Sequence, residues 1–300
     1  MESTAYSPAH ITGLVRAYEY PDDPISTGSK GVGFSIQKGV TTHVKATLST
    51  NSEIKIEING TPATDAQVSE HVAKTLIAKT GRSHKILIRH KIDPPIGVGF
   101  GTSGAAALSL TLALNDTLNL SLSRIEAAKE AHLAEVACNT GLGTVLAEMH
   151  GGFEARVKPG APGFGRVVPI PFTGEYVMVA LILGSLSTGN MLRELRRKGE
   201  AAALGERLLD IFLADRSVES FLKLSNQFSQ TLGLSPRLKG ILKEADDAGF
   251  VCSMALFGET VFTLVKPSEV EDIKQILMKH TVNGTNILVS QTENRGARLL

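Results

Sequence analysis

The sequence predicts a two-domain protein that combines α-helices with β-strands. Its 300 residues are enough for about two domains of ordinary size. Segments in which polar and apolar residues alternate, as in strands, are interspersed with segments that repeat apolar residues at helical spacing. A stretch rich in glycine and proline, residues 159–171, separates these segments into two groups. We therefore expect one domain over residues 1–165 and a second over residues 166–300.

The first group contains both kinds of element. The predicted strands are residues 42–49, 53–58 and 85–89, and the predicted helices are residues 69–80, 103–115 and 124–137. The helix at 103–115 is apolar nearly all round, so we expect it to be buried. Ser123 and Glu126 have the spacing of a capping box, which marks the start of the third helix. The alanines of that helix allow a neighbouring element to approach closely.

The second group predicts an antiparallel sheet with helices on one face. A strongly apolar strand is expected at residues 177–183 and a helical region at about 199–232. Ser235 and Pro236 predict a helix start, and Gly249 its end. The remaining expected elements are strands at 252–257 and 260–265 joined by a turn at Gly258-Glu259, a helix at 268–280 and a last strand at 287–290.

Composition excludes several classes of protein. The chain has 31 Lys and Arg against 30 Asp and Glu, and it lacks the basic excess typical of nucleic-acid binders. Cys138 and Cys252 lie far apart, so neither a disulfide framework nor a structural zinc site is expected. The N-terminal residues do not resemble a signal peptide, and apolar runs of about 10 residues are too short to span a bilayer. We expect a cytoplasmic protein that binds neither nucleic acid nor membrane.

A glycine-rich run, residues 94–107, carries the strongest chemical signal. Gly97, Gly99 and Gly101 alternate, and the hydroxyls of Thr102 and Ser103 follow where a helix is expected to begin. Free N–H groups and the positive end of the helix dipole suit a phosphate at such a place. A tight turn between a strand and a packed helix is the alternative. The dinucleotide and Walker fingerprints both fail, because no acidic residue and no Gly-Lys-Ser/Thr stand at the required positions.

The run resembles the phosphate loop of the GHMP kinases, P-x-x-x-G-L-G-S-S-A-A. The matching stretch is Pro95-Ile96-Gly97-Val98-Gly99-Phe100-Gly101-Thr102-Ser103-Gly104-Ala105, which departs from that pattern at Phe100, Thr102 and Gly104. Further segments are similar to the archaeal pantoate kinases in particular. These segments are residues 7–13, 21–24, 28–33, 39–42, 131–135, 140–143, 151–156 and 254–262.

This resemblance implies a fold and an activity. The fold is α+β, with an N-terminal α/β domain over 1–165 and a smaller ferredoxin-like domain over 166–300. The activity is transfer of the γ-phosphate of ATP to the 4-hydroxyl of pantoate, on the route to coenzyme A, and a homodimer is implied. The expected ATP-loop residues are Pro95, Gly97, Gly99, Gly101, Thr102, Ser103, Gly104 and Ala105. Homoserine, mevalonate or a sugar are alternative acceptors.

The resemblance also implies a metal site and a substrate site. Glu135 matches a Mg²⁺ ligand, and Ser103 supplies a hydroxyl for the metal or the phosphate. His132 shares a helix face with Glu135, and we expect it to face pantoate. Arg156 is suited to clamp the pantoate carboxylate, because its guanidinium is a planar bidentate donor. Further substrate contacts are expected from Ser29 and from Ser187 or Thr188. An exposed charged edge is the alternative for the helix pair, and a solvated strand residue is the alternative for the arginine.

Thr144 departs from the family pattern. Pantoate kinases resemble G-L-G-D-V at the second glycine loop, and this chain reads Gly141-Leu142-Gly143-Thr144-Val145. A threonine cannot take a proton from the attacking hydroxyl at neutral pH. Three explanations compete: a kinase that works without a base, which the loose transition state of phosphoryl transfer allows; another base such as His132; or a homologue that binds a nucleotide or metabolite without useful turnover.

Overall fold

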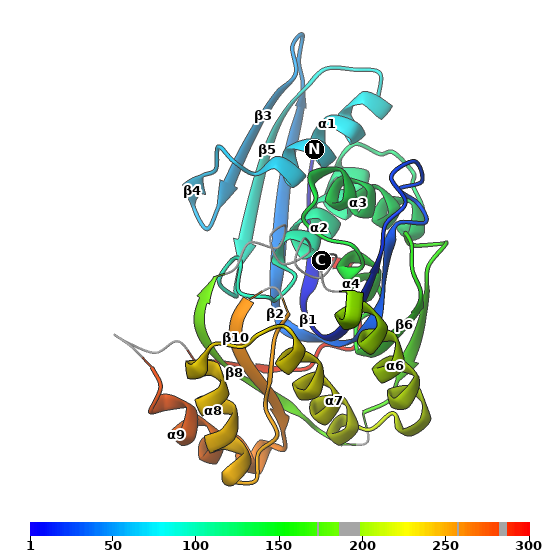
Figure 1. The fold of residues 1–300 in the computed structure, drawn as a ribbon. Helices are drawn as coiled ribbons and strands as arrows, with labels where there is room; N and C mark the ends of the chain where they lie inside the picture. The colour runs from blue at the N-terminus through cyan, green and yellow to red at the C-terminus, as the bar shows by residue number, and fades with distance from the viewer. Residues whose placement is uncertain (173, 186–198, 257, 282–286) are drawn as a thin grey trace.

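The computed structural model describes residues 1–172, 174–185, 199–256, 258–281 and 287–300. Two sheets form the framework (Figure 1). The strands of the larger sheet are β1 (Glu2–Tyr18), β2 (Gly28–Leu48), β3 (Glu53–Ile58), β4 (Thr61–Pro62), β5 (His84–Ile92), β6 (Phe153–Lys158), β7 (Arg166–Ile170) and β12 (Arg298–Leu299). The smaller sheet consists of β8 (Val177–Ser185), β9 (Ser253–Met254), β10 (Gly258–Val265) and β11 (Ile287–Gln291).

The helices fall into two groups along the chain. The first group packs with the larger sheet and consists of α1 (Gln67–Lys79), α2 (Thr102–Thr117), α3 (Arg124–Cys138) and α4 (Thr144–His150). The remaining ones are α6 (Gly199–Asp215), α7 (Val218–Thr231), α8 (Pro236–Asp247), the short 3₁₀ helix η1 (Pro267–Glu269) and α9 (Val270–Met278). No helix within the described ranges is long and apolar enough to cross a membrane.

The larger sheet is organised around the long strand β2. Its strand order is β12-β1-β2-β5-β3-β4; β6 also pairs with β2, and β7 pairs with β6. The first part of β2 pairs with β6 and its second part with β5, whereas β1 runs antiparallel along nearly its whole length. Strands β7 and β12 come from beyond residue 165, so this sheet takes strands from both parts of the expected division.

Helix α2 fills the centre of the larger layer. It is apolar all round, as its sequence predicts, and most of its residues are buried. Leu108, Leu110 and Leu114 share a core with α1, α3 and the strands β2 and β5. Full burial of one such side chain is worth roughly 1.5–3 kcal/mol. This packing fixes the N-terminus of α2, and with it the glycine run that precedes the helix.

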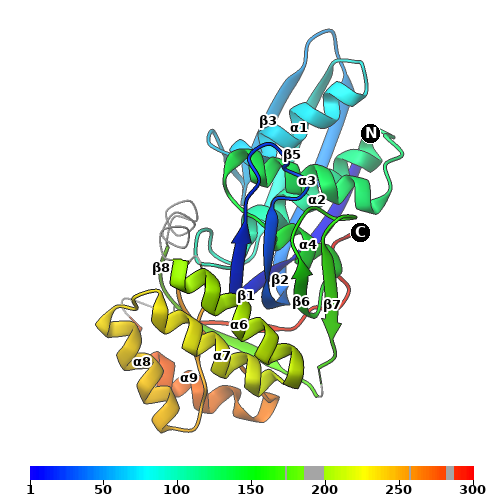
Figure 2. The same ribbon diagram turned by 45° about the vertical axis from the view of Figure 1, so that its right-hand side comes forward.

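The smaller sheet has an apolar core on each face. Val179 and Leu181 of β8 pack with α8 and α9, whereas Met178 and Ala180 point to the opposite face. That second face packs against α6, α7 and the strands β1, β2 and β6 of the larger sheet. Figure 2 shows α6 and α7 side by side beneath the larger sheet, and α8 and α9 beyond them. The expected sheet with helices on one face is therefore correct only in part.

Most predicted elements are confirmed, with shifted ends. Ser123 and Glu126 form the predicted capping box of α3, and Ser235 caps α8. The turn expected at Gly258-Glu259 is wrong, because these residues begin β10. A Cβ at Gly258 would lie 2.0 Å from the carbonyl group of Val98. Glycine is needed there so that the strand can approach the glycine run, which is a tertiary requirement.

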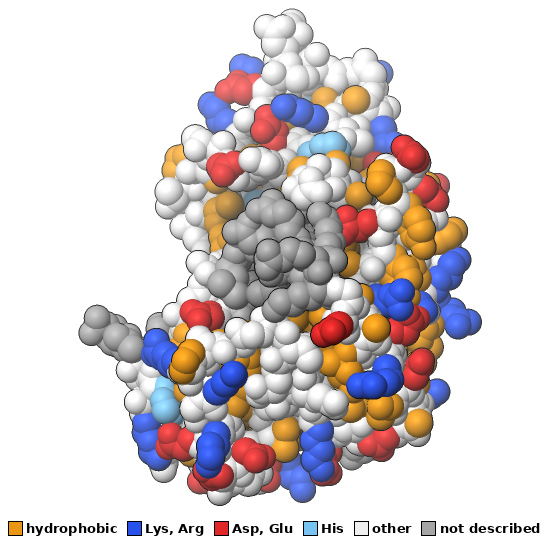
Figure 3. Space-filling view, viewed as in Figure 1, with side chains coloured by type: hydrophobic (Ala, Val, Ile, Leu, Met, Phe, Trp, Pro, Cys, Tyr) orange, Lys and Arg blue, Asp and Glu red, His pale blue; other side chains and the backbone are white. Residues whose placement is uncertain are grey.

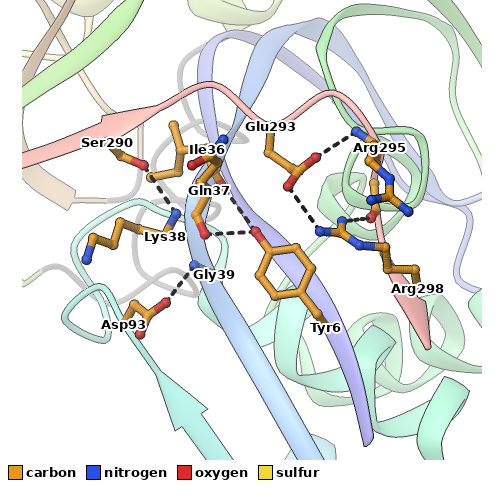
Figure 4. A network of polar contacts seen from close by, with 12 residues as sticks. Tyr6, Ile36, Gln37, Lys38, Gly39, Asp93, Ser290, Glu293, Arg295 and Arg298 are labelled. Carbon is orange, nitrogen blue, oxygen red and sulfur yellow. Dashed lines mark hydrogen bonds and ion pairs between the residues drawn. The ribbon is translucent and has the colours of Figure 1, made fainter. Parts of the chain in front are cut away.

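The C-terminal segment is anchored on β1 and β2. The Tyr6 hydroxyl donates to the carbonyl of Gln37 at 2.9 Å, and the Arg298 guanidinium lies 4.7 Å from the Tyr6 ring (Figure 4). Arg298 also pairs with Glu293, and the Ser290 hydroxyl accepts from the backbone N–H of Lys38. These contacts stabilise the middle of the two strands that supply side chains to the candidate site.

Candidate active site

One pocket gathers the glycine run, the start of α2, the second glycine loop and the facing strands. Its lining residues are His10, Thr12, Val15, Ala17, Ser29, Ile96, Gly97, Gly99 to Gly104, Glu135, Thr140 to Thr144, Arg156 and Leu256. Leu256 belongs to the second group of elements, so both groups contribute to the pocket. Pro95 and Ala105, which we expected in the ATP loop, flank this lining on either side.

The glycine run adopts a backbone that disfavours other residues. Gly97, Gly99 and Gly101 have φ angles of +79°, +89° and +64°. A Cβ at Gly99 would also lie 2.8 Å from the carbonyl oxygen of Leu256. The run is held against the smaller sheet by Thr260, whose hydroxyl donates to the Val98 carbonyl at 2.9 Å. The loop is therefore a preformed backbone cradle.

The N-terminus of α2 opens into this pocket without a cap of its own. Gly101 is the N-cap residue, no side chain accepts from the first N–H groups, and the first turn carries no acidic residue. Unpaired N–H groups and the positive dipole end therefore remain available to an anion. The geometry matches the phosphate-binding expectation drawn from the sequence.

Ser103 and Glu135 meet at the edge of the cradle. The Ser103 hydroxyl donates to Oε1 of Glu135 at 2.5 Å, and the Thr140 hydroxyl donates to the same oxygen at 2.6 Å. Burial raises the pKa of Glu135, and these two hydrogen bonds oppose that rise. A hydroxyl and a carboxylate at this point form an oxygen donor set that suits a hard cation.

Arg156 is a buried part of the pocket lining. Its Nη1 donates to Oε1 of Glu154 at 2.9 Å, and Nη2 makes only a long contact of 3.4 Å to the Thr12 hydroxyl. Nε is buried and has no hydrogen-bond partner. Nε and Nη2 form one edge of the guanidinium, and this buried edge has unused hydrogen-bonding capacity of the kind that a carboxylate would satisfy side-on.

Ser29 and Thr144 line the pocket together with Arg156, whereas His132 does not. Ser29 packs against Gly143, where a Cβ would lie 2.2 Å from its hydroxyl oxygen. Nε2 of His132 contacts the carbonyl of Thr27 at 2.9 Å, so this histidine braces the segment before Ser29 and is absent from the lining. Burial lowers its pKa. Ser187 and Thr188 lie outside the described residues.

Several polar residues near the pocket escaped the sequence interpretation. His10 and Thr12 stand two apart on β1, and Glu154 stands two before Arg156 on β6, so each pair shares a strand face. Glu148 lies one helical turn after Thr144, fully buried, with neither carboxylate oxygen hydrogen-bonded. Burial raises its pKa well above the usual value. These strand residues lie within the segments 7–13 and 151–156 that resemble the family, but no role was assigned to them individually from the sequence.

The described charged residues are mixed in sign on the face shown in Figure 3. Lys and Arg side chains are interspersed there with Asp and Glu. This mixture agrees with the balanced charge of the sequence, in which 31 basic residues face 30 acidic ones. Among the described residues, no group of three or more His, Cys, Asp or Glu is arranged to hold a metal ion by itself.

Known proteins resemble this chain over most of its length. Residues 67–152 match the family described as the GHMP kinases N terminal domain. A pantoate kinase of Thermococcus kodakarensis is 33% identical over 285 residues, which are 91% of this chain and 91% of that protein. A pantoate kinase of Methanocaldococcus jannaschii is 31% identical and covers 91% of this chain and 96% of that protein.

A solved structure confirms the fold. It is described as a phosphotransferase related to the CoA biosynthesis pathway, and it aligns with a TM-score of 0.89 and 29% identity over 100% of this chain and 98% of that one. The α+β architecture of the GHMP kinases is thus shared across both sheets. With the match of the GHMP kinase domain and two relatives above 30% identity, the chain belongs to the pantoate kinase family of the GHMP kinases.

Proposed function

We propose that this chain is an ATP- and Mg²⁺-dependent kinase that converts pantoate into 4-phosphopantoate for coenzyme A biosynthesis. One observation carries the proposal: a single pocket contains two groups that suit anions. The uncapped N-terminus of α2 is suited to a polyphosphate, and the incompletely hydrogen-bonded edge of Arg156 is suited to a carboxylate. A small alcohol that also bears a carboxylate fits between them, as the relatives' names suggest.

The backbone cradle is assigned to ATP. Gly97, Gly99 and Gly101 leave no side chain between the loop and a bound polyphosphate, and the hydroxyls of Thr102 and Ser103 add donors at the helix start. A side chain at Gly101 would meet Thr144 at 2.5 Å, so the loop and the second glycine loop are already in close contact. Little rearrangement is then needed when phosphate binds.

The metal is assigned to Ser103 and Glu135. Mg²⁺ prefers one or two protein oxygens together with phosphate oxygens and water, and this pair supplies that kind of set. When bound, the ion would neutralise charge that develops on the phosphate oxygens. Glu135 must be ionised to bind it, and the hydrogen bonds from Ser103 and Thr140 favour that ionised form.

The acceptor is assigned to the Arg156 end of the pocket. Nε and Nη2 would hold the carboxylate, and the Ser29 hydroxyl would contact the body of the substrate. His132 acts indirectly in this assignment, because it braces the Thr27 carbonyl two residues before Ser29. Ser187 and Thr188 remain proposed contacts from the second domain.

Thr144 favours one competing function, a nucleotide- or metabolite-binding protein without useful turnover. The residue begins α4 and lines the pocket, where an aspartate is expected from the family pattern. Phosphoryl transfer depends mainly on positioning and charge neutralisation, and general-base help adds about 10²–10⁴-fold. We therefore favour a working kinase. A Thr144→Asp variant is expected to be faster, and an unchanged or slower rate would show that position 144 is not the base position.

Purified protein tests the proposal directly. ATP and Mg²⁺ are supplied with pantoate, homoserine or mevalonate in parallel, and ADP formation and the phosphorylated product are measured. Pantoate is expected to be the preferred acceptor. ATP binding without ADP formation above background would support the competing function. Turnover of another acceptor without turnover of pantoate would reassign the substrate.

Assembly and location complete the proposal. A homodimer and a cytoplasmic location are implied by the family resemblance. Sedimentation velocity at several protein concentrations tests the homodimer, because a protein that stays monomeric at all concentrations would contradict it.

A further inference from the structure

His10 and Glu154 form a buried pair on the wall of the pocket. Nε2 of His10 lies 2.9 Å from Oε1 of Glu154, and both side chains are fully buried. The same carboxylate oxygen accepts from Nη1 of Arg156 at 2.9 Å. The backbone N–H of His10 donates to the carbonyl of Phe100 at 3.0 Å. His10 is thus held at both ends, by the Arg156 region and by the glycine run.

A glycine in β2 makes this pair possible. β2 lies between β1 and β6, and Gly33 is paired with Thr12 on one side and with Glu154 on the other. A Cβ at Gly33 would lie 2.4 Å from Cε1 and 2.6 Å from Nε2 of His10. The imidazole therefore crosses over β2 through the space that Gly33 leaves empty.

The hydrogen bonds define the tautomer of His10. Oε1 of Glu154 already accepts a hydrogen bond from Nη1 of Arg156, and a carboxylate oxygen bonded in this way also serves as the acceptor for Nε2 of His10. Nε2 must therefore carry the proton, and Nδ1 keeps a lone pair. Nδ1 has one contact among the described residues, a long 3.3 Å approach to the Thr12 hydroxyl. A carboxylate that orients a histidine while the other ring nitrogen remains basic is the arrangement of a general base.

We propose that His10 is the catalytic base that Thr144 cannot be, with Glu154 as its positioning residue. This proposal rests on the proposed kinase function. Nδ1 accepts the proton as the acceptor O–H bond breaks, the acceptor oxygen forms a bond to the γ-phosphorus, and the bond from that phosphorus to the bridging oxygen breaks to release ADP. The proton stays on the imidazolium, which Glu154 stabilises, and passes to water when product leaves.

The ionisation state of His10 suits this role. Burial lowers its pKa, the hydrogen bond and charge of Glu154 raise it, and the charge of Arg156 lowers it again, with a net lowering from 6.5. Glu148 is a further titratable neighbour, since its Oε1 and the His10 carbonyl both approach the Cβ position of Gly101. The imidazole is therefore neutral at pH 7 and becomes protonated only in more acidic solution. The rate is expected to fall on the acidic side as this base is lost.

Kinetics of matched variants test the proposal. In His10→Gln, kcat is expected to fall about 10²–10⁴-fold while the KM for ATP changes little, and the acidic limb of the kcat–pH profile disappears. In Glu154→Gln the limb should move to lower pH, because the neutral amide no longer stabilises the imidazolium. His71→Gln, at an exposed position on α1, is the control and should stay within twofold. A His10→Gln variant within threefold of wild type, or one that keeps the limb, overturns the proposal.

A second measurement does not depend on turnover. The ¹⁵N-histidine spectrum reports which ring nitrogen is protonated, and the His10 signal is the one lost in His10→Gln among the 8 histidines. Protonation at Nε2 with a basic Nδ1 supports the proposal, and protonation at Nδ1 overturns it even if the variant kinetics are confounded by misfolding. Absence of pantoate turnover by the wild type would instead contradict the proposed function, so the two failures are distinguishable.

Discussion

Replacing Arg156 with lysine tests the carboxylate site with the least disturbance of the fold. Arg156 is buried, and its Nη1 pairs with Glu154, so a neutral residue would leave this buried carboxylate without its cationic partner, which typically costs about 3–5 kcal/mol of stability. Lysine keeps the positive charge beside Glu154. It removes the incompletely hydrogen-bonded edge formed by Nε and Nη2, which no other described side chain of the pocket duplicates.

The expected loss follows from the contacts. Two charge-assisted hydrogen bonds to a carboxylate are each worth about 1.5–3 kcal/mol, and the retained charge of lysine recovers part of that sum. A net loss of about 2–4 kcal/mol corresponds to a decrease of about 30- to 1,000-fold in kcat/KM for pantoate. The proposed ATP cradle is formed by other residues, the glycine run and the start of α2, so the KM for ATP should stay nearly constant.

The assay compares pantoate with its amide, which lacks the carboxylate charge. The wild type is expected to prefer the acid strongly, and Arg156→Lys should lose most of that preference. Arg89→Lys is the matched control, because Arg89 forms an exposed ion pair with Glu57 at 2.9 Å and such pairs contribute little. An equal decrease for acid and amide, or a parallel rise in the KM for ATP, would refute the assignment of Arg156 to the carboxylate.

Three further predictions concern the metal, the loop and a buried acid. Glu135→Gln should raise the Mg²⁺ concentration needed for half-maximal rate at least tenfold. Glu130→Gln, on the same helix, is the control and should leave that concentration unchanged. An unchanged Mg²⁺ dependence of Glu135→Gln would exclude Glu135 as a ligand. Gly99→Ala should destabilise the protein by about 1–3 kcal/mol in urea unfolding and raise the KM for ATP, because a Cβ would lie 2.8 Å from the carbonyl oxygen of Leu256. Gly81→Ala is the control: Gly81 also has a positive φ but has open space around its Cβ position, so ATP binding should be unchanged. Burial raises the pKa of Glu148, so its contribution to stability is fully present below pH 4.5 and is lost as the pH rises through the native pKa. The stability of Glu148→Gln relative to wild type should therefore increase between pH 5 and pH 8. An equal difference between variant and wild type at both pH values would contradict this.

Patterns of neighbouring residues were enough to predict the elements that depend on contacts between residues close together in the chain. The capping box of Ser123 and Glu126, the Ser235 cap and the uniformly apolar α2 are confirmed at nearly the expected positions. Strand β1 was missed, because residues 5–15 are all buried and show no alternation of polar and apolar side chains. The turn at Gly258 was misinterpreted for a related reason. A glycine that serves close approach between distant segments looks the same in sequence as one that serves a turn.

The candidate site shows the same contrast between features set by neighbouring residues and features set by tertiary contacts. Residues that belong to contiguous motifs, such as Ser103, Glu135 and Arg156, could be selected from the sequence, and the structure brings them into one pocket. His132 matches its motif equally well, yet it contacts the Thr27 carbonyl and is absent from the pocket lining. Spacing along a helix shows which residues share a face. It does not show what that face meets.

The sequence by itself determined the family, the phosphate loop and the unexpected threonine at position 144, because each depends on residues close together in the chain. Only the tertiary structure decided which side chains of the pocket are hydrogen-bonded to one another. His10 and Glu154 are 144 positions apart, and they meet only because β2 lies between their strands and carries Gly33 at the crossing. A hydrogen bond of this kind depends on strand order and register. Those are set by packing of the whole sheet, and no local pattern around either residue specifies them.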